Sequence, residues 1–367
     1  MTDIIFVTQL VDPDDPVLGF TIRQIQALAQ RARRVVVIAN EVRHVPDDLG
    51  AEVVSLGKER GHSSYRRGLR YELTLIRLAR ELHRPALFAH MCPQYLTLGA
   101  AVALPTKMPA ILWFTHPSDS GALGRATRLA DVVVTALPGS FPRQSVKVRP
   151  IGHAVDLDRF PFTDPVIAPG SCHLLAVGRT SRVKGYPLMI EAIARARAAG
   201  TDATLTIVGP STNDAEREHR TELVDLIERR DVADRVQLLD GVAHSQVAAF
   251  VHEATALVSA TVAGSADKSV FEAMACGRPT LVSNPAFFPL MANSPISLRF
   301  VADDPSSLAE RISAIANASP DCMIDVGRAL RSTIERDHSL EHWAEQVVDI
   351  AEEVRSTAGR RHASPTR

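Results

Sequence analysis

Cysteine is scarce in this chain of 367 residues, which has only Cys92, Cys172, Cys276 and Cys322. No two of them form a Cys-x-x-Cys pair and their density is too low for a disulfide scaffold, so we expect a reducing, cytoplasmic setting and no zinc ribbon. The 41 basic residues nearly cancel the 42 acidic ones, which argues against a nucleic-acid partner. No apolar run approaches the roughly 18 residues of a transmembrane helix, and we expect no signal peptide.

Short apolar runs are frequent, and helical patterns separate many of them. Most of the runs are continuously apolar, which is typical of strands buried on both faces of a parallel sheet. Alternation of strands and helices predicts an α/β fold. The runs expected to be strands are residues 4–7, 35–39, 52–56, 86–90, 110–115, 131–135 and 146–149, then 173–177, 203–208, 236–239, 256–259, 280–283 and 298–301.

The two halves of the chain repeat this pattern, and a proline-rich segment separates them. Residues 161–171 contain three prolines and a Pro-Gly pair, which is typical of a linker or hinge. We therefore predict two Rossmann-like, doubly wound domains, 1–160 and 172–339, that face each other across a cleft. A helix over 340–355 is expected to pack back toward the first domain, and 356–367 is expected to be a disordered tail.

One apolar run of the second half leads directly into a glycine and a group of cations. Gly178 precedes Arg179, and Lys184 follows five residues after Arg179. Ligands of doubly wound sheets bind beyond the carboxyl ends of the strands. A planar guanidinium and an ammonium at such a position are suited to clamp a diphosphate. The alternative is a solvated basic turn, and this segment alone leaves both interpretations open.

A second polar segment follows a later strand of the same half. It begins with Gly264 and Ser265, and a helix is predicted over 269–276. The N-terminus of that helix offers unpaired N–H groups to an anion. Glu272 lies three residues after Ser269, and Ser-x-x-Glu is also the pattern of a capping box, which alone would explain the carboxylate.

These segments resemble the donor-binding domain of the retaining, family-4 glycosyltransferases, which have the GT-B fold. The likeness covers roughly residues 150–285. In the N-terminal half it rests mainly on Gly19 and His116. The motifs that carry the resemblance are Gly152-x-x-Val155-Asp156-x-x-Arg159-Phe160, Gly178-Arg179 with Lys184-Gly185, Ile207-Val208-Gly209, Val236-x-x-Leu239-x-Gly241 and Glu272-Ala273-Met274-Ala275-x-Gly277-x-Pro279.

The resemblance implies transfer of a hexose-type sugar from a nucleoside diphosphate sugar, of UDP or GDP type, to an acceptor hydroxyl with retention of configuration. Arg179 and Lys184 would be catalytic, because they would neutralise the leaving diphosphate, and Glu272 would accept hydrogen bonds from the ribose. The N-terminal domain would bind a carbohydrate, lipid-linked or small-molecule acceptor. No metal or other cofactor is expected. The other residues expected at the donor site are Gly178, Gly209, Gly264 and Ser265.

Two residues of the first half receive roles from the same resemblance. Gly19 would approach the phosphate or the acceptor, and the alternative is an ordinary strand-to-helix turn. His116 follows the run 110–115 and would contact the donor sugar as a third catalytic residue, and the alternative is a buried core histidine. For His90, which also ends a strand, we expect the core role.

The chain departs from the family pattern at position 264. Members of the family usually carry two acids eight positions apart, and Gly264 stands where the first is expected. Asp267 would take over the contact with the sugar hydroxyls, and Lys268 would add charge near the phosphate. Alternatively, Asp267 merely favours the helix N-terminus. Residues 283–288 replace the family's usual Gly-Gly loop, which leaves the donor open. Two further functions follow as alternatives, a nucleotide-sugar epimerase and an inactive nucleotide-sugar-binding protein.

A basic stretch lies outside these motifs. Residues 58–84 contain eight Lys or Arg and three Glu, with leucines at helical spacing among the arginines. A basic amphipathic helix can lie on an anionic membrane surface, and this predicts peripheral contact with the inner face of a membrane. The alternative is a helix with one solvated face.

Overall fold

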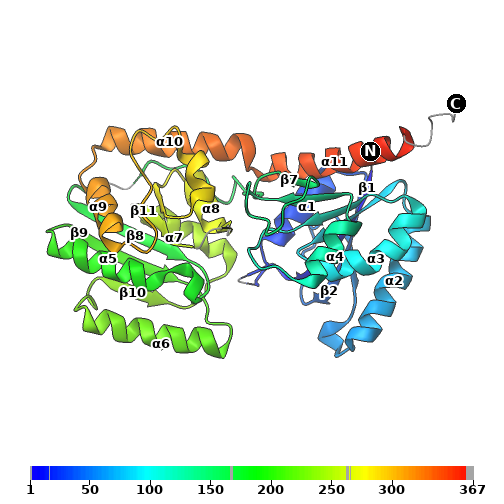
Figure 1. Ribbon diagram of the computed structural model, residues 1–367, viewed down its shortest axis with the longest axis horizontal. Helices are drawn as coiled ribbons and strands as arrows, with labels where there is room; N and C mark the ends of the chain where they lie inside the picture. The colour runs from blue at the N-terminus through cyan, green and yellow to red at the C-terminus, as the bar shows by residue number, and fades with distance from the viewer. Residues whose placement is uncertain (1, 16, 166–167, 262–263, 265, 361–367) are drawn as a thin grey trace. The chain divides into compact units, whose positions relative to one another are not determined.

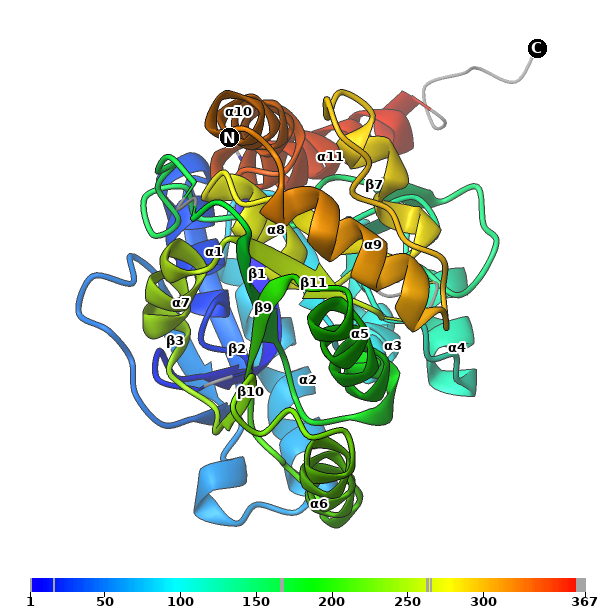
Figure 2. The ribbon, with the colours of Figure 1, turned by 90° about the vertical axis from the view of Figure 1, so that its left-hand side faces the viewer.

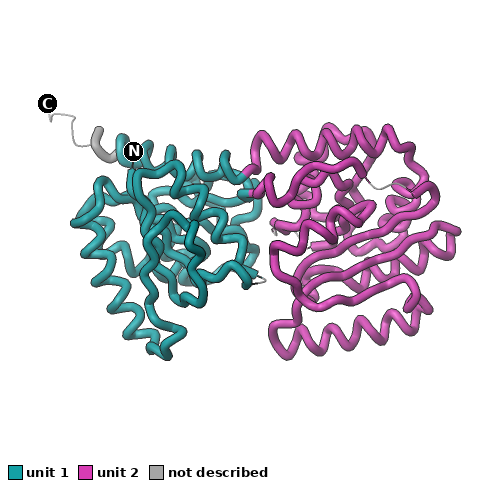
Figure 3. Tube along the Cα trace, turned by 180° about the vertical axis from the view of Figure 1, so that it is seen from behind, with its two compact units in different colours: residues 1–154, 340–367 teal, residues 155–339 magenta. Residues whose placement is uncertain are grey.

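The computed structural model describes residues 2–360 apart from positions 16, 166–167, 262–263 and 265. The chain divides into two compact units, each built on one parallel sheet with helices on its faces (Figure 1). Unit 1 contains residues 1–154 and 340–367, and unit 2 contains residues 155–339 (Figure 3).

The sheet of unit 1 has seven parallel strands in the order β3-β2-β1-β4-β5-β6-β7. Strand β1, in the interior of this sheet, is buried along almost its whole length, as expected for a strand covered on both faces. The strands are β1 Asp3–Val11, β2 Arg34–Val42, β3 Glu52–Ser55, β4 Pro85–His90, β5 Ala110–Trp113, β6 Val132–Thr135 and β7 Val148–Pro150. The helices are α1 Thr21–Arg31, η1 Lys58–Arg60, α2 Ser64–Glu81, α3 Pro93–Thr106, α4 Gly121–Leu129 and α11 Leu340–Arg360.

The sheet of unit 2 has five parallel strands in the order β10-β9-β8-β11-β12. Helices α5, α6 and α9 lie on one side of this sheet, and α7 and α8 lie on the other (Figure 2). The strands are β8 Ser171–Val177, β9 Asp202–Val208, β10 Val236–Leu239, β11 Ala256–Ser259 and β12 Thr280–Val282. The helices are η2 Arg182–Lys184, α5 Tyr186–Ala198, α6 Asp214–Arg229, η3 His244–Gln246, α7 Val247–Glu253, α8 Lys268–Ala275, η4 Pro285–Met291, α9 Pro305–Ala316 and α10 Pro320–Asp337.

The strand order reverses at one point in each sheet. In unit 1 the chain proceeds outward from β1 in one direction and then restarts beside it with β4, and in unit 2 the same happens at β8 and β11. This is the order of a doubly wound Rossmann-like domain, so the predicted fold class is confirmed. Such a reversal opens a crevice beyond the carboxyl ends of the two strands, and the loops after β8 and β11 therefore carry the candidate site of unit 2.

Two of the predicted strands differ from the structure. Residues 298–301 form a single bridge between Arg299 and Val282 instead of a strand, because the chain enters a turn at residues 302–303, where Asp303 has a φ of 59°. The strand predicted at 146–149 begins later, as β7, and Val146 is fully exposed. Neither change affects the central strands that carry the candidate site.

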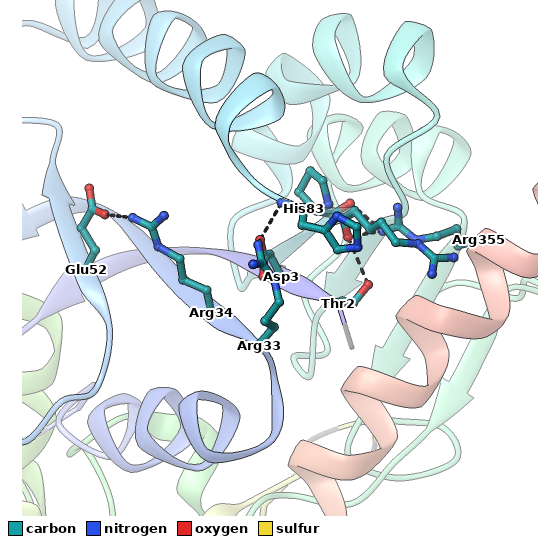
Figure 4. A network of polar contacts seen from close by, with 9 residues as sticks. Thr2, Asp3, Arg33, Arg34, Glu52, His83 and Arg355 are labelled. Carbon is teal, nitrogen blue, oxygen red and sulfur yellow. Dashed lines mark hydrogen bonds and ion pairs between the residues drawn. The ribbon is translucent and has the colours of Figure 1, made fainter.

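The C-terminal helix α11 groups with unit 1 and contacts α1. Arg355 on α11 donates through Nη2 to the carbonyl oxygen of Pro85, at 2.8 Å, and to that of Arg84. Nearby, the buried carboxylate of Asp3 accepts from Arg33 and, at 2.7 Å, from the backbone N–H of His83 (Figure 4). The helix runs to Arg360, so the disordered tail predicted from 356 is wrong for 356–360. Residues 361–367 of that predicted tail lie outside the described residues.

The segment predicted as a hinge, 161–171, lies within unit 2, and the chain crosses between the units at 154/155 and 339/340. Its described part is held by a buried arginine. Arg278 donates to the carbonyl oxygen of Thr163 at 2.8 Å and to its hydroxyl at 2.7 Å. These bonds hold Thr163 on its own unit, so the described residues 161–165 do not connect the two units.

Candidate functional site

The candidate site of unit 2 is made of loops that follow four parallel strands. Gly178 follows β8, Gly209 follows β9, His244 comes after β10 and Asp267 comes after β11. Because carboxyl ends of parallel strands meet at one edge of the sheet, residues more than 80 positions apart in the sequence become neighbours there. The sequence-predicted residues Arg179, Lys184, Asp267 and Glu272 all lie in or directly after these loops.

Arg179 leaves the end of β8 and forms an ion pair with Glu216 on α6. Its Nη1 lies 3.0 Å from Glu216 Oε1, and the arginine side chain remains 44% exposed while the glutamate is buried. Burial raises the pKa of Glu216, but hydrogen bonds from the backbone N–H and hydroxyl of Thr212 and the nearby Arg179 charge outweigh it and lower the pKa below its usual value. The carboxylate stays ionised and orients a guanidinium whose other face is open to an anion.

Lys184 is paired with Asp267, the residue just before α8. Lys184 Nζ lies 2.9 Å from Asp267 Oδ2, with the lysine side chain 18% exposed. The same carboxylate accepts from the hydroxyls of Ser259 and Ser269, both at 3.0 Å. Asp267 therefore anchors Lys184 between β8 and β11. The proposed contact of Asp267 with sugar hydroxyls stays a prediction.

Glycine is required where the loop after β8 turns. Gly178 has a φ of 146°, and a Cβ there would lie 2.5 Å from Lys184 Cε and Nζ, so a side chain at 178 would displace the lysine. Tyr186, which sequence reasoning missed, is buried and donates from its hydroxyl to the carbonyl oxygen of Gly178 at 2.7 Å. Burial raises its pKa, so the hydroxyl remains a donor.

The capping-box explanation of Glu272 is wrong. Helix α8 begins at Lys268 with Asp267 in the N-cap position, so Ser269 is inside the helix and Glu272 lies beyond its first turn. Ser269 instead donates to Asp267. Glu272 is buried and accepts a hydrogen bond from His244 Nε2 at 2.8 Å, with Lys268 Nζ at 3.6 Å. This carboxylate is therefore held by side chains from two separate segments and is not part of a helix cap.

His244 connects Glu272 to a second cation. Its Nδ1 lies 3.0 Å from Arg159 Nη1. A guanidinium can only donate, so Nδ1 is the acceptor and the ring proton is on Nε2, facing Glu272. Beside them, burial lowers the pKa of Lys268, and the charges of Glu272 and Asp156 partly offset that effect. The site thus combines the carboxylates of Glu216, Asp267 and Glu272 with arginine and lysine cations.

Two further predicted residues lie in the loop before α8. Gly264 has a φ of 86°, a left-handed conformation in which a residue with a Cβ is strained. The backbone therefore favours glycine at the position where the family pattern has an acid. Ser265 lies outside the described residues.

The predicted residues of unit 1 have different surroundings in the structure. A Cβ on Gly19 would lie 2.6 Å from the carbonyl oxygens of both Pro13 and Asp15, so close backbone contact in the turn before α1 explains this glycine. His116 is exposed after β5, and its Nδ1 accepts from the backbone N–H of Ser118 at 3.1 Å, so the core alternative for His116 is wrong. His90 is buried against Phe6 and Trp113, which confirms its core role.

Sequence reasoning missed Glu216 and His244. Glu216 lies three residues after Asn213, which caps α6. This pattern predicts a role for Glu216 in the helix cap, and it gives no sign of an ion pair with Arg179. His244 comes shortly after the parallel strand β10. Because ligands bind beyond the carboxyl ends of such strands, its position in the sequence could have identified it. Among the residues that the structure describes, no three or more His, Cys, Asp and Glu side chains gather in a way that could hold a metal ion.

The fold of this chain is similar to that of several solved structures. A glycosyltransferase from Rickettsia africae has a TM-score of 0.74 at 14% identity, over 96% of this chain and 98% of that one. The Anabaena protein HepE in complex with UDP-glucose has a TM-score of 0.70 at 16% identity, over 98% and 99%. These likenesses identify the GT-B fold, with two Rossmann-like domains.

The match to a sequence family lies in unit 2. Residues 171–318 match the family described as "Glycosyl transferases group 1". A glycogen synthase of Mycobacterium tuberculosis is 27% identical over 172 residues, which are 47% of this chain and 39% of that protein. A D-inositol 3-phosphate glycosyltransferase of Pseudarthrobacter chlorophenolicus is 31% identical over 33% of this chain and 28% of that protein. The chain thus spans well under half the length of these curated relatives.

Proposed function

We propose that this protein is a glycosyltransferase that moves a hexose-type sugar from a nucleoside diphosphate sugar to an acceptor hydroxyl with retention of the anomeric configuration. The observation that carries the proposal is the pair of cations Arg179 and Lys184 at the carboxyl end of β8, each oriented by a carboxylate of its own unit. The match of residues 171–318 to a glycosyltransferase family supports the same activity, because it includes both loops.

The cations would act on the leaving group. When the bond between the sugar C1 and the diphosphate oxygen breaks, its electron pair remains on the diphosphate, while the acceptor oxygen bonds to C1 and its proton passes to the departing phosphate oxygen. Arg179 and Lys184 would stabilise the charge that develops there. Because Glu216 and Asp267 already hold them in place, little reorganisation is needed on binding.

The donor proposed is of the UDP or GDP type, with Glu272 accepting hydrogen bonds from the ribose hydroxyls. The structures of the Anabaena protein with UDP and with UDP-glucose support the UDP form. Unit 1 would bind the acceptor, with His116 near the donor sugar. Since two side-chain cations neutralise the diphosphate in this proposal, we expect transfer to persist when divalent metals are removed with a chelator.

A thermal-shift panel of UDP-, GDP-, ADP- and TDP-sugars tests the proposal. A donor at about 100 times its dissociation constant should add about 2.7 kcal/mol to the free energy of unfolding. With the donor so identified, NMR of the transfer product should give the same anomeric configuration as in the donor. An epimerised nucleotide sugar formed without acceptor would contradict transfer and identify an epimerase.

A non-catalytic nucleotide-sugar-binding protein is the second candidate, and Gly264 favours it. The left-handed backbone at this position excludes an unstrained acid. Under this alternative the donor would stabilise the protein, but neither transfer nor slow hydrolysis of the donor would be detected.

His244 should position Glu272, and His244→Ala is expected to weaken nucleotide binding about tenfold. The substitution removes the Nε2 donor from a buried carboxylate, so the dissociation constant should rise more than kcat falls. His244→Gln, whose amide can donate to the same oxygen, should recover part of the affinity. His252→Ala on α7 is the control, since this histidine contacts the carbonyl oxygen of Pro161 instead. Equal losses in the two alanine variants, measured by titration calorimetry with the nucleotide, would refute the positioning role.

A further inference from the structure

Helix α2 of unit 1 has two apolar faces, and the core uses only one of them. Tyr71, Leu75 and Leu78 are buried in the cluster that packs under the sheet. Tyr71 also donates from its hydroxyl to the backbone oxygen of Tyr95 on α3 at 2.8 Å. This face packs α2 against the core of unit 1.

The second apolar face of α2 is exposed. Tyr65 is 82% exposed, Leu69 51%, Leu73 60% and Ile76 37%. Spacings of four, four and three residues place these side chains in one row along the helix. Single exposed leucines are ordinary, but a continuous exposed row on the face opposite the core marks an interaction surface.

A row of arginines runs beside the apolar row. Arg66, Arg70 and Arg77 are spaced four and seven residues apart, which places them on one side of the helix. Helix α2 contains five arginines and two glutamates. The two rows border a shallow hollow of about 410 Å³, lined by Arg66, Leu69, Arg70, Leu73, Thr74 and Arg77. One wall of this hollow is therefore cationic and the other is apolar.

The arginines of this surface are available to an external anion. Within the part of the chain that the structure describes, no carboxylate lies within ion-pair distance of Arg66 or Arg70. The ion pairs of Arg77 with described residues are long, 3.8 Å to Glu52 and 4.0 Å to Glu81. Ion pairs this long and this exposed contribute little, so the described carboxylates neutralise the charge of this row only in part.

We propose that α2 docks this protein on the surface of an anionic lipid bilayer. Tyr65, Leu69, Leu73 and Ile76 would enter the level of the headgroups, and the arginines would contact lipid phosphates beside them. A free phosphate or a nucleic acid would use the cations and leave the leucines in water, whereas a lipid uses both walls of the hollow. No helix among the described residues has the length and apolarity to cross a membrane, so the contact proposed is with the surface.

Vesicle co-sedimentation of the full chain tests this inference. Binding to vesicles of phosphatidylcholine with phosphatidylglycerol should exceed binding to pure phosphatidylcholine and should weaken as salt is raised. Leu69→Ser with Leu73→Ser should lower the partition coefficient by about tenfold or more. Arg66→Gln with Arg70→Gln should lower it and also flatten the salt dependence. Leu69, Leu73 and Arg66 are exposed and Arg70 is half-buried, so the thermal unfolding midpoint should change by little in either variant.

A matched control is available on α6 of unit 2, where Val224 is also exposed and Arg229 ends the helix. Val224→Ser with Arg229→Gln should leave vesicle binding intact. The inference would be overturned by absent or lipid-independent binding, by equal losses in the α6 control, or by self-association through Leu69 and Leu73 in size-exclusion chromatography. The inference does not depend on the proposed transfer, because the α2 variants should keep the thermal response to the nucleotide sugar.

Discussion

Arg179→Ala and Lys184→Ala are each expected to abolish the stabilisation by a nucleotide sugar and to lower its turnover by about two to three orders of magnitude. Both residues stand at the carboxyl end of β8, where the strand order of unit 2 reverses, and both are oriented by carboxylates at about 3 Å. Loss of either cation leaves part of the leaving diphosphate charge unbalanced in the transition state. Differential scanning fluorimetry and a release assay for the nucleoside diphosphate measure the two effects.

Arg182→Ala is the matched control for both variants. Arg182 lies in the same short helix as Lys184, but its side chain is 64% exposed and is paired with Glu222 on α6. It should respond to the nucleotide sugar like the parent protein. If Arg179→Ala and Lys184→Ala also respond like the parent, the assignment of the diphosphate to these cations is wrong.

Lys184→Ala has a second effect, because it leaves the buried carboxylate of Asp267 without its cation. Removal of one partner of a buried pair costs about 3–5 kcal/mol, and the exposed fraction of Lys184 reduces that cost here. Lys184→Met combined with Asp267→Asn removes both charges and keeps the serine hydroxyls bonded to the amide. This double variant should be folded and still unresponsive to the nucleotide sugar, which separates binding from stability.

Gly209→Ala is expected to destabilise the protein by about 3 kcal/mol or more. A Cβ at this position would lie 2.5 Å from the carbonyl carbon of Gly178 and nearer still to its oxygen. Both are backbone atoms, so the ends of two central strands, β8 and β9, would have to separate. Urea unfolding followed by circular dichroism measures the loss.

Gly68→Ala is expected to change the stability of the protein in the opposite direction. Gly68 lies inside α2, and a Cβ there meets nothing within 4 Å. Alanine has the higher helix propensity, so this variant should gain about 0.5–1 kcal/mol. Equal and small effects at positions 209 and 68 would show that the loops after β8 and β9 are free to move apart.

Acid pH should affect the site through Glu216, whose pKa is lowered in the folded protein. A carboxylate of this kind contributes stability above its unfolded pKa, and the contribution is lost as pH falls through the lower folded value. Since Glu216 also orients Arg179, protonation in that range should release the guanidinium. This dependence could not be read from the sequence, because the two residues are separated by 37 positions.

The sequence was sufficient for the central strands and for the loops that follow them. Runs such as 203–208 are continuously apolar because both faces of the strand are covered, and that pattern is local. A local pattern could not decide whether Glu272 in Ser269-x-x-Glu272 belongs to a helix cap or to the candidate site. A shift of two residues in the start of α8 decides whether Glu272 is part of a cap. Helix ends are set by tertiary contacts such as the anchoring of Asp267 by Lys184 and Ser259.

By itself, the sequence determined the α/β class, the doubled architecture, and the glycines and cations after β8. The tertiary structure alone decided which carboxylate faces which cation, that His244 joins Arg159 to Glu272, and that 161–165 is held on unit 2. The physical reason is range: strand burial and turn chemistry act between neighbours in the chain, whereas Arg179–Glu216, Lys184–Asp267 and His244–Glu272 form only where separate strands end at one edge of a sheet.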